Sequence, residues 1–228
     1  MEKMKRYAIY YAPKAGEFAD SAATWLGWDM QTGNVVPQPT VTLPRPLAEI
    51  TSEPRKYGFH GTIKAPFRLA EGVRYADFSQ ATARLAASLR PVVLPGLQMI
   101  NLEGFLALVP QGDTAALMAL AAEVVRSLDP YRAPLTKAEI ARRRPDRLTA
   151  RQRELLAAYG YPYVMEEFRF HLTLTGPLTE AEHPDVAKVA ATHFARLVPT
   201  PFRVEDLCLV GEDEAGRFHL LHRYALSA

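Results

Sequence analysis

The stretches Phe59-His60-Gly61-Thr62-Ile63 and Phe170-His171-Leu172-Thr173-Leu174 share one pattern: an aromatic residue, His, any residue, Thr and an aliphatic residue. Both stretches have the residue types of strands, and the second is expected to run from about Glu167 to Thr175. Because side chains alternate between the two faces of a strand, each stretch would bury an apolar face and present an imidazole beside a hydroxyl on the other. The expected polar faces carry His60, Thr62 and Lys64 in the first strand, and Arg169, His171, Thr173 and Thr175 in the second.

Two such strands facing each other would surround an anion with two titratable groups and two hydroxyl donors. This arrangement suits acid–base chemistry on a phosphate group. A simpler interpretation also fits, because a single His-x-Thr in a strand is usually a satisfied histidine near the surface. Two copies with the same preceding aromatic favour a shared functional site, although a structural repeat with solvent-facing histidines would show the same pattern.

The composition is that of an ordinary globular protein. The chain has 228 residues, of which 48% are hydrophobic and 23% charged, and its net charge is +2. This charge is too small to imply nucleic acid or an anionic membrane as a partner. A single cysteine, Cys208, excludes an internal disulfide and is expected to be a buried thiol. No secretory signal or membrane span is apparent, so a cytoplasmic location is expected.

The order of expected elements suggests a weak internal duplication. The series strand, helix, His strand, helix and two strands is expected twice, which predicts an α+β fold whose halves exchange a strand. Residues 129–163 interrupt the second half. They contain two capping boxes, beginning at Thr136 and Thr149, which predict short helices over about 137–144 and 150–159.

This interrupting segment is strongly basic, with eight basic and three acidic side chains between Tyr131 and Glu154. One interpretation is a pair of solvated helices. The other is a cover that brings guanidinium groups to a phosphorylated substrate, since the planar Arg fork matches phosphate oxygens. Gly160-Tyr161-Pro162-Tyr163 would then return the chain to the sheet with two aromatic rings beside the site.

The paired His-x-Thr strands, with similar element order around each, resemble the 2H phosphoesterase superfamily. The extended motifs are similar to its DUF1045 branch, which is described as phosphonate-metabolism proteins, and the likeness covers essentially the whole chain. The stretches that carry it are RYAIYYAP (6–13), YGFHGTIKAPF (57–67), RAPL (132–135), ARRRP (141–145), GYPYV (160–164) and EFRFHLTLTGP (167–177).

The resemblance implies a single bilobal, LigT-like domain over 1–228, with two pseudo-symmetric lobes around a central cleft and the basic helical insertion at about 129–163. It assigns His60 and Thr62 to one motif and His171 and Thr173 to the other, and it implies neither metal nor cofactor. No HExxH sequence, Asp-rich cluster or Cys pair supplies a metal-ligand set. The expected substrate-binding residues are Lys64, Arg169, Arg132, Arg143 and Tyr161.

The expected reaction is metal-independent opening of a small cyclic phosphodiester, with one histidine as general base and the other as general acid. The substrate could be a ribosyl cyclic phosphate of phosphonate breakdown. One alternative is an RNA-end enzyme, a 2′,3′-cyclic phosphodiesterase or 2′-5′ ligase, which would need a long basic groove. Another is a module that binds a phosphorylated metabolite without turning it over. The sequence leaves the oligomeric state and the assignment of acid and base open.

Overall fold

Seven strands form one antiparallel sheet in the order β11-β10-β1-β4-β8-β7-β6. The computed structural model describes residues 4–228. The strands of this sheet are β1 (Arg6–Tyr11), β4 (Gly61–Phe67), β6 (Leu97–Leu102), β7 (Phe105–Pro110), β8 (Leu172–Thr173), β10 (Asp206–Glu212) and β11 (Phe218–Ala225). Two small ribbons accompany it, β2 (Trp28–Asp29) with β3 (Asn34–Val35), and β5 (Val92–Leu94) with β9 (Phe202–Val204).

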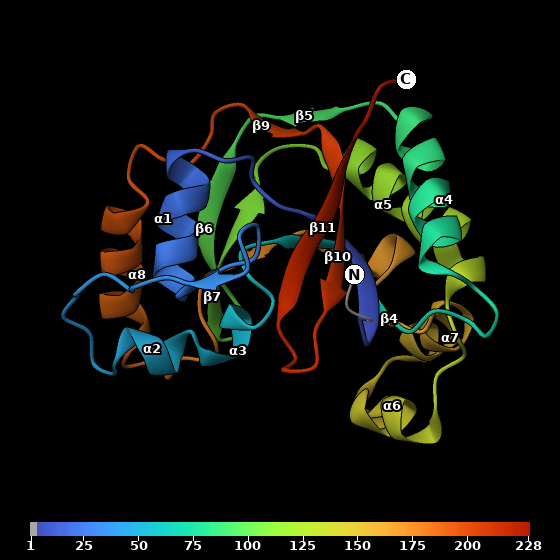
Figure 1. Ribbon diagram of the computed structural model, residues 1–228. Coiled ribbons are helices and arrows are strands. Elements are labelled where there is room, and N and C mark those ends of the chain that lie inside the picture. Colours follow the sequence, from blue (N-terminus) through green and yellow to red (C-terminus); the bar gives the residue numbers. More distant parts are fainter. Residues whose placement is uncertain (1–3) are drawn as a thin grey trace.

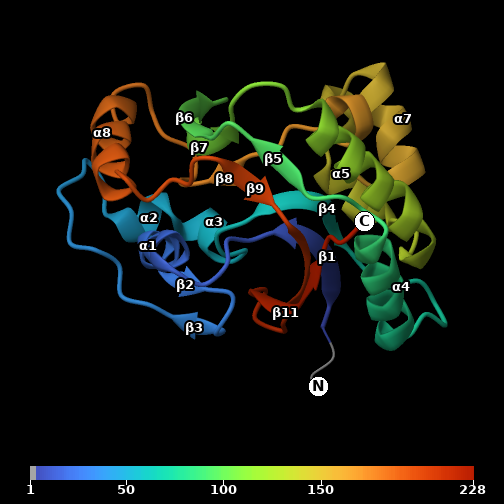
Figure 2. The same cartoon turned by 90° about the horizontal axis from the view of Figure 1, so that it is seen from above.

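Four longer helices flank the sheet, α1 (Glu17–Leu26) with α8 (His183–His193) at one side and α4 (Tyr75–Ala87) with α5 (Ala115–Leu128) at the other (Figures 1 and 2). Helix α7 (Ala150–Tyr159) is as long as α1 and lies in the interrupting segment. The short helices are α2 (Leu47–Ile50), α3 (Ser52–Arg55) and α6 (Lys137–Arg142), and 3₁₀ turns cover Asp129–Tyr131, Pro145–Arg147 and Met165–Glu167. No helix in residues 4–228 combines the length and the apolar character needed to cross a membrane.

The expected duplication is visible in the connectivity. Apart from the β2–β3 ribbon, α2 and α3 in the first half and α6 and α7 in the second, the first half runs β1-α1-β4-α4-β5-β6 and the second β7-α5-β8-α8-β9-β10, followed by β11. Strand β6 of the first half pairs with β7 of the second, whereas β10 of the second half pairs with β1 of the first. Each half therefore gives a strand to the other, as the element order predicted. Because the two halves interlock, the sheet is continuous across the middle of the molecule.

The two faces of the sheet have different partners. Alternate residues of β1, such as Ile9, join the main core with the apolar faces of the long helices. The intervening residues, such as Tyr10, join a smaller cluster with Trp28, Phe218 and the buried thiol of Cys208. Ile63 and Leu172 lie in the main core, so the apolar sides of both His motifs face the helices as expected. The polar sides consequently face away from the helices.

The second His strand is much shorter than predicted. The expected strand over about 167–175 is reduced to Leu172–Thr173. On its N-terminal side, a 3₁₀ turn precedes it. On its C-terminal side, the amides of Leu174 and Thr175 both donate to the carbonyl of Leu106, which ends the regular ladder. The Thr175 hydroxyl accepts from the Leu106 amide at 3.0 Å, so this side chain satisfies the backbone at the irregularity.

Candidate active site

The two His-x-Thr motifs pair directly with each other at the centre of the sheet. Gly61 of β4 is the partner of Leu172 of β8 in an antiparallel pair. This register places Thr62 across from His171 and His60 across from Thr173. The middle residues of the two motifs thus mark the local pseudo-twofold axis, and both imidazoles and both hydroxyls belong to one face of the sheet.

Glycine is required in the first motif by the close approach of the second. A Cβ atom at position 61 would overlap the ring of Phe170, which packs over Gly61 on the helix-covered face. The aromatic residue of one motif therefore occupies the space left by the missing side chain of the other. This contact explains how the two strands come close enough to share a site.

The two imidazoles are held in the same way. Nδ1 of His60 bonds the carbonyl of Gly58 at 2.9 Å, and Nδ1 of His171 bonds the carbonyl of Arg169 at 2.8 Å. Each carbonyl belongs to the residue two positions before the histidine and accepts a hydrogen bond from Nδ1–H. The neutral tautomer therefore keeps its proton on Nδ1 and leaves the Nε2 lone pair available for chemistry. Nε2 of His60 lies 3.1 Å from the Thr62 hydroxyl, which can donate to it.

The surroundings of the two histidines differ. The buried ring of Tyr10 stacks on His60 with a centroid distance of 3.9 Å. Burial is the largest cause of a lowered pKa of His60, about 4, with the Gly58 carbonyl opposing the shift and His171 adding to it. Burial also lowers the pKa of His171, but there the Arg169 carbonyl and the Glu103 carboxylate both favour the charged form. His60 is thus the more strongly neutral of the two.

Two cavities meet at the paired motifs. One, of about 510 Å³, is lined by His60, Thr62 and Thr173 among others. The second, of about 490 Å³, is lined by His171. The residues that line both are Thr62, Ala65, Phe105 and Tyr161, so the two cavities are sections of one cleft. Each has a volume typical of small-molecule sites. We name them the His60 section and the His171 section.

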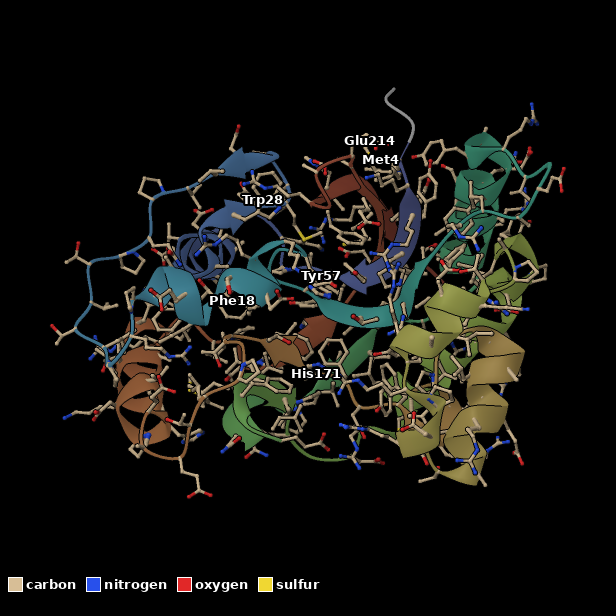
Figure 3. The ribbon with its side chains drawn as sticks, turned by 90° about the horizontal axis from the view of Figure 1, so that it is seen from below. Met4, Phe18, Trp28, Tyr57, His171 and Glu214 are labelled. Carbon is tan, nitrogen blue, oxygen red and sulfur yellow. The ribbon has the colours of Figure 1, made fainter. Side chains whose placement is uncertain are left out.

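The basic insertion forms one wall of this cleft. Both capping boxes are present, and α7 spans the predicted residues, whereas α6 ends at Arg142, two residues before its predicted end. Leu155 of α7 and Val164 pack with Val125 of α5 and fasten the insertion to the body. Arg143 lies over the ring of Tyr161 at 4.9 Å, and both line the His60 section. Figure 3 shows Tyr57 and His171 near the middle of this face, with the olive helices of the insertion to one side.

Lys64 does not share the face of His60, contrary to prediction. The pairing of β4 with β1 shifts between Tyr10↔Thr62 and Ile9↔Lys64. This bulge adds one residue to β4 and turns Lys64 to the other side of the sheet. There it is buried and forms an ion pair with Asp129 at 3.1 Å. Burial lowers the pKa of Lys64, against the opposing effect of Asp129.

Arg132 also lies apart from the cleft. Its guanidinium donates to both carboxylate oxygens of Asp129, at 2.8 and 3.0 Å, and to the carbonyl of Ala158. Lys64, Asp129 and Arg132 thus join β4 to the start of the insertion, which gives the two cations a structural role. Arg169 is exposed, pairs with Glu103 at 3.2 Å and lines the His171 section beside His171.

Several lining residues were not assigned to the site by the sequence analysis, although Arg6, Tyr57 and Arg142 lie in the stretches that carry the family resemblance. Arg6 begins β1 and Phe105 begins β7, so both reach the cleft through strand pairing, whereas Tyr57 lies in the turn before the first motif. The ring of Phe105 lies 5.8 Å from that of His171. Arg142 also lines the cleft, and the signal for it was its place beside Arg143 in the stretch ARRRP (141–145).

No group of three or more His, Cys, Asp or Glu side chains within residues 4–228 is arranged to hold a metal ion. Four carboxylates line the two sections together with imidazoles, hydroxyls and guanidinium groups. The imidazoles, hydroxyls and guanidinium groups can exchange protons and bind anionic oxygen atoms.

The DUF1045 family, described as "Protein of unknown function", matches residues 62–219. The chain belongs to this family. It is 37% identical over 222 residues to the "Ribose 1,5-bisphosphate phosphokinase PhnN" of Janthinobacterium sp. (strain Marseille), and 36% identical over 214 residues to the protein of the same name from Laribacter hongkongensis. These matches cover 94% and 92% of this chain but 49% of each relative, so the DUF1045 chain spans about half their length.

Solved structures with a similar arrangement include E. coli LigT complexed with 3′-AMP, with 15% identity, a TM-score of 0.48 and coverage of 99% of this chain and 100% of that one. Another is TT0787 of Thermus thermophilus, with 16% identity, a TM-score of 0.45 and 97% of each chain covered.

Proposed function

We propose that this DUF1045 protein is a metal-independent phosphoesterase that opens a small cyclic phosphodiester by acid–base catalysis with His60 and His171. The observation that carries the proposal is the direct pairing of the two His-x-Thr motifs, with Gly61 opposite Leu172. This pairing brings two imidazoles with matching Nδ1 contacts to one face of the sheet. Binding an anion would need no second titratable group, whereas displacement at phosphorus needs one proton removed and one supplied.

The reaction balances with water as the only co-reactant. One histidine, neutral, removes a proton from the attacking water as its oxygen bonds to phosphorus. The other, protonated, gives its proton to the leaving oxygen as the ring P–O bond breaks. The product is a ring-opened phosphomonoester. Thr173 donates a hydrogen bond to a non-bridging oxygen, where negative charge is held in the transition state, and Thr62 does the same once its hydroxyl turns away from Nε2 of His60.

We assign the base to His60 and the acid to His171. The Tyr10 ring and burial keep His60 neutral, with a pKa of about 4. His171 lies in the section of the cleft that contains Glu103, whose negative charge favours the imidazolium form. An anionic phosphate in the cleft would raise the pKa values of both histidines. For His171 this effect adds to that of the Glu103 carboxylate, which already favours its imidazolium form.

The relatives' names point to phosphorylated ribose as a substrate class. The two curated relatives are named for ribose 1,5-bisphosphate, and they are about twice as long as this chain. We do not extend the kinase activity in the relatives' names to this chain. A GxxxxGK[ST] phosphate-binding loop requires a Gly-Lys dipeptide, and the sequence contains none. We therefore propose a ribosyl cyclic phosphate, formed in phosphonate breakdown, as the substrate.

The test is a chelator-treated preparation of the full chain, incubated with ribosyl 1,2-cyclic phosphate and 2′,3′-cyclic nucleotides and followed by phosphorus NMR. His60→Ala and His171→Ala serve as matched variants. Turnover that survives chelation and is lost in both variants supports the two-histidine mechanism. Preference for cyclic nucleotides at RNA ends would instead identify the RNA-end enzyme. Binding without turnover of any compound would contradict the proposal and identify a phosphate-binding module.

A further inference from the structure

The His60 section of the cleft contains more cationic groups than one phosphodiester requires. Four arginines line it, namely Arg6, Arg68, Arg142 and Arg143. A cyclic phosphodiester carries a single negative charge, and the paired motifs already surround it with two imidazoles and two hydroxyls. The additional guanidinium groups therefore need a separate explanation.

Two of the four arginines are neutralised by carboxylates. Arg6 forms a two-pronged ion pair with Glu212, with an Nη2–Oε1 distance of 2.8 Å. Arg68 forms another with Glu139, with distances of 3.1 and 3.0 Å. The bond from Arg68 is the largest cause of a Glu139 pKa of about 2, so this carboxylate is ionised at neutral pH. The guanidinium groups of Arg6 and Arg68 are therefore already bonded to carboxylates of the protein.

The other two arginines have no carboxylate partner among residues 4–228. Arg142 ends α6 and Arg143 follows it. The guanidinium of Arg143 lies over the Tyr161 ring at 4.9 Å. A guanidinium held beside an aromatic ring is restricted in advance and still carries N–H donors for an acceptor.

The acidic side chains of this section do not cancel these charges. The section is lined by two carboxylates, Glu53 and Glu139. Glu53 pairs with Lys56 at 2.8 Å and Glu139 with Arg68. The His171 section differs, because Glu103 and Glu167 line it and its one arginine, Arg169, pairs with Glu103. The cationic excess is therefore confined to the His60 side of the cleft.

We propose that Arg142 and Arg143 bind a second phosphate group of the substrate, remote from the phosphodiester that reacts. The substrate is then a sugar cyclic phosphate that also bears a phosphomonoester, and the monoester points into the His60 section. A dianionic phosphate with three terminal oxygens matches two neighbouring guanidinium forks. This inference rests on the proposed function, because the position of the reacting group is set by the two His-x-Thr motifs.

The decisive experiment compares ribosyl 1,2-cyclic phosphate with its 5-phosphate, using the full chain. We expect the additional phosphate to raise kcat/KM at least about tenfold, mainly through KM. In the double variant Arg142→Ala/Arg143→Ala this preference should fall to about twofold or less. Lys137→Ala/Arg147→Ala is the matched control, because it removes two positive charges from the same insertion outside the cleft, and it should keep the preference.

A second measurement is independent of turnover. Ribose 5-phosphate should bind the wild-type chain and Lys137→Ala/Arg147→Ala equally in calorimetry, and the double variant Arg142→Ala/Arg143→Ala at least about tenfold more weakly. Equal kcat/KM for the two cyclic substrates, or binding of ribose 5-phosphate that the double variant retains, would overturn the second-phosphate site while leaving the phosphoesterase proposal intact. Loss of ribose 5-phosphate binding in the double variant, with neither cyclic compound turned over by the wild-type chain, would refute the phosphoesterase proposal and retain the arginine site.

Discussion

The two His-x-Thr motifs have the same local geometry in different environments. In both, Nδ1–H of the imidazole donates a hydrogen bond to the carbonyl of the residue two positions earlier. The first motif, however, begins a seven-residue strand with Tyr10 stacked on its histidine, whereas the second surrounds a two-residue strand near Glu103. The shared sequence thus sets the orientation of each imidazole, and the neighbours from other elements set its protonation. A duplicated motif can in this way supply both an acid and a base.

The largest expected effect tests whether the two motifs act as one unit. His60→Ala and His171→Ala should each lower kcat by about 10²–10⁴-fold, because each removes one of two coupled proton transfers. The double variant should be about as slow as the slower single variant, since groups that act in one step are not additive. Single-turnover rates on the preferred cyclic substrate give the comparison. A loss below tenfold in both single variants would show that the paired motifs do not carry the reaction.

The second prediction concerns the difference in protonation between the histidines. The pKa of His60 is about 4 in the folded protein and near its ordinary value of 6.5 after unfolding. Between these values the unfolded chain binds the proton more readily, so stability falls as pH drops from about 6.5 to 4, by about 1.4 kcal/mol per pH unit.

Urea unfolding at pH 7 and pH 4.5 measures this difference. The fall in the free energy of unfolding between pH 7 and pH 4.5 should be about 2–3 kcal/mol smaller in His60→Gln than in the wild-type chain, because Gln does not titrate. In His171→Gln this reduction should be less, since Glu103 and the Arg169 carbonyl oppose the effect of burial. Equal changes in the two variants would remove the asymmetry on which the assignment of acid and base rests.

The third prediction compares the two hydroxyls. Thr62→Val and Thr173→Val should each lower kcat/KM by about tenfold to a hundredfold, the range of one hydrogen bond to a charged group. The Thr62 hydroxyl also lies 3.1 Å from Nε2 of His60, so its loss should additionally shift the pH dependence of kcat/KM. Rate profiles from pH 4 to 9 measure both effects. An unchanged kcat/KM in both variants would exclude the hydroxyls from phosphate binding.

The smallest expected effect tests the contact that brings the motifs together. Gly61→Ala should destabilise the protein by about 1–3 kcal/mol, because the new methyl group overlaps the Phe170 ring. Phe170→Leu leaves room for that methyl group, so adding Gly61→Ala to it should cost clearly less than in the wild-type chain. A double-mutant cycle in urea gives the coupling. Strictly additive changes in the free energy of unfolding would show that the contact between Gly61 and Phe170 does not limit how closely the two motifs pack.

The sequence was most informative where the information is local or repeated. The alternation around His60 and His171 predicted which side chains are buried, and the capping boxes at Thr136 and Thr149 predicted α6 and α7. The strand exchange followed from the order of elements. Lys64 was placed on the wrong face because a β-bulge depends on the neighbouring strand, β1, and leaves no clear local signal.

By itself, the sequence determined the four residues of the paired motifs, the α+β order of elements and the basic character of the insertion. The tertiary structure decided which arginines remain available, since Arg132 is taken by Asp129 and Arg68 by Glu139, while Arg142 and Arg143 face the cleft. The tertiary structure also makes His60 the less solvated of the two histidines, because Tyr10 of the neighbouring strand β1 stacks on its ring. The physical reason is that side-chain periodicity acts over a few residues, whereas charge pairing and desolvation depend on groups that only the fold brings together.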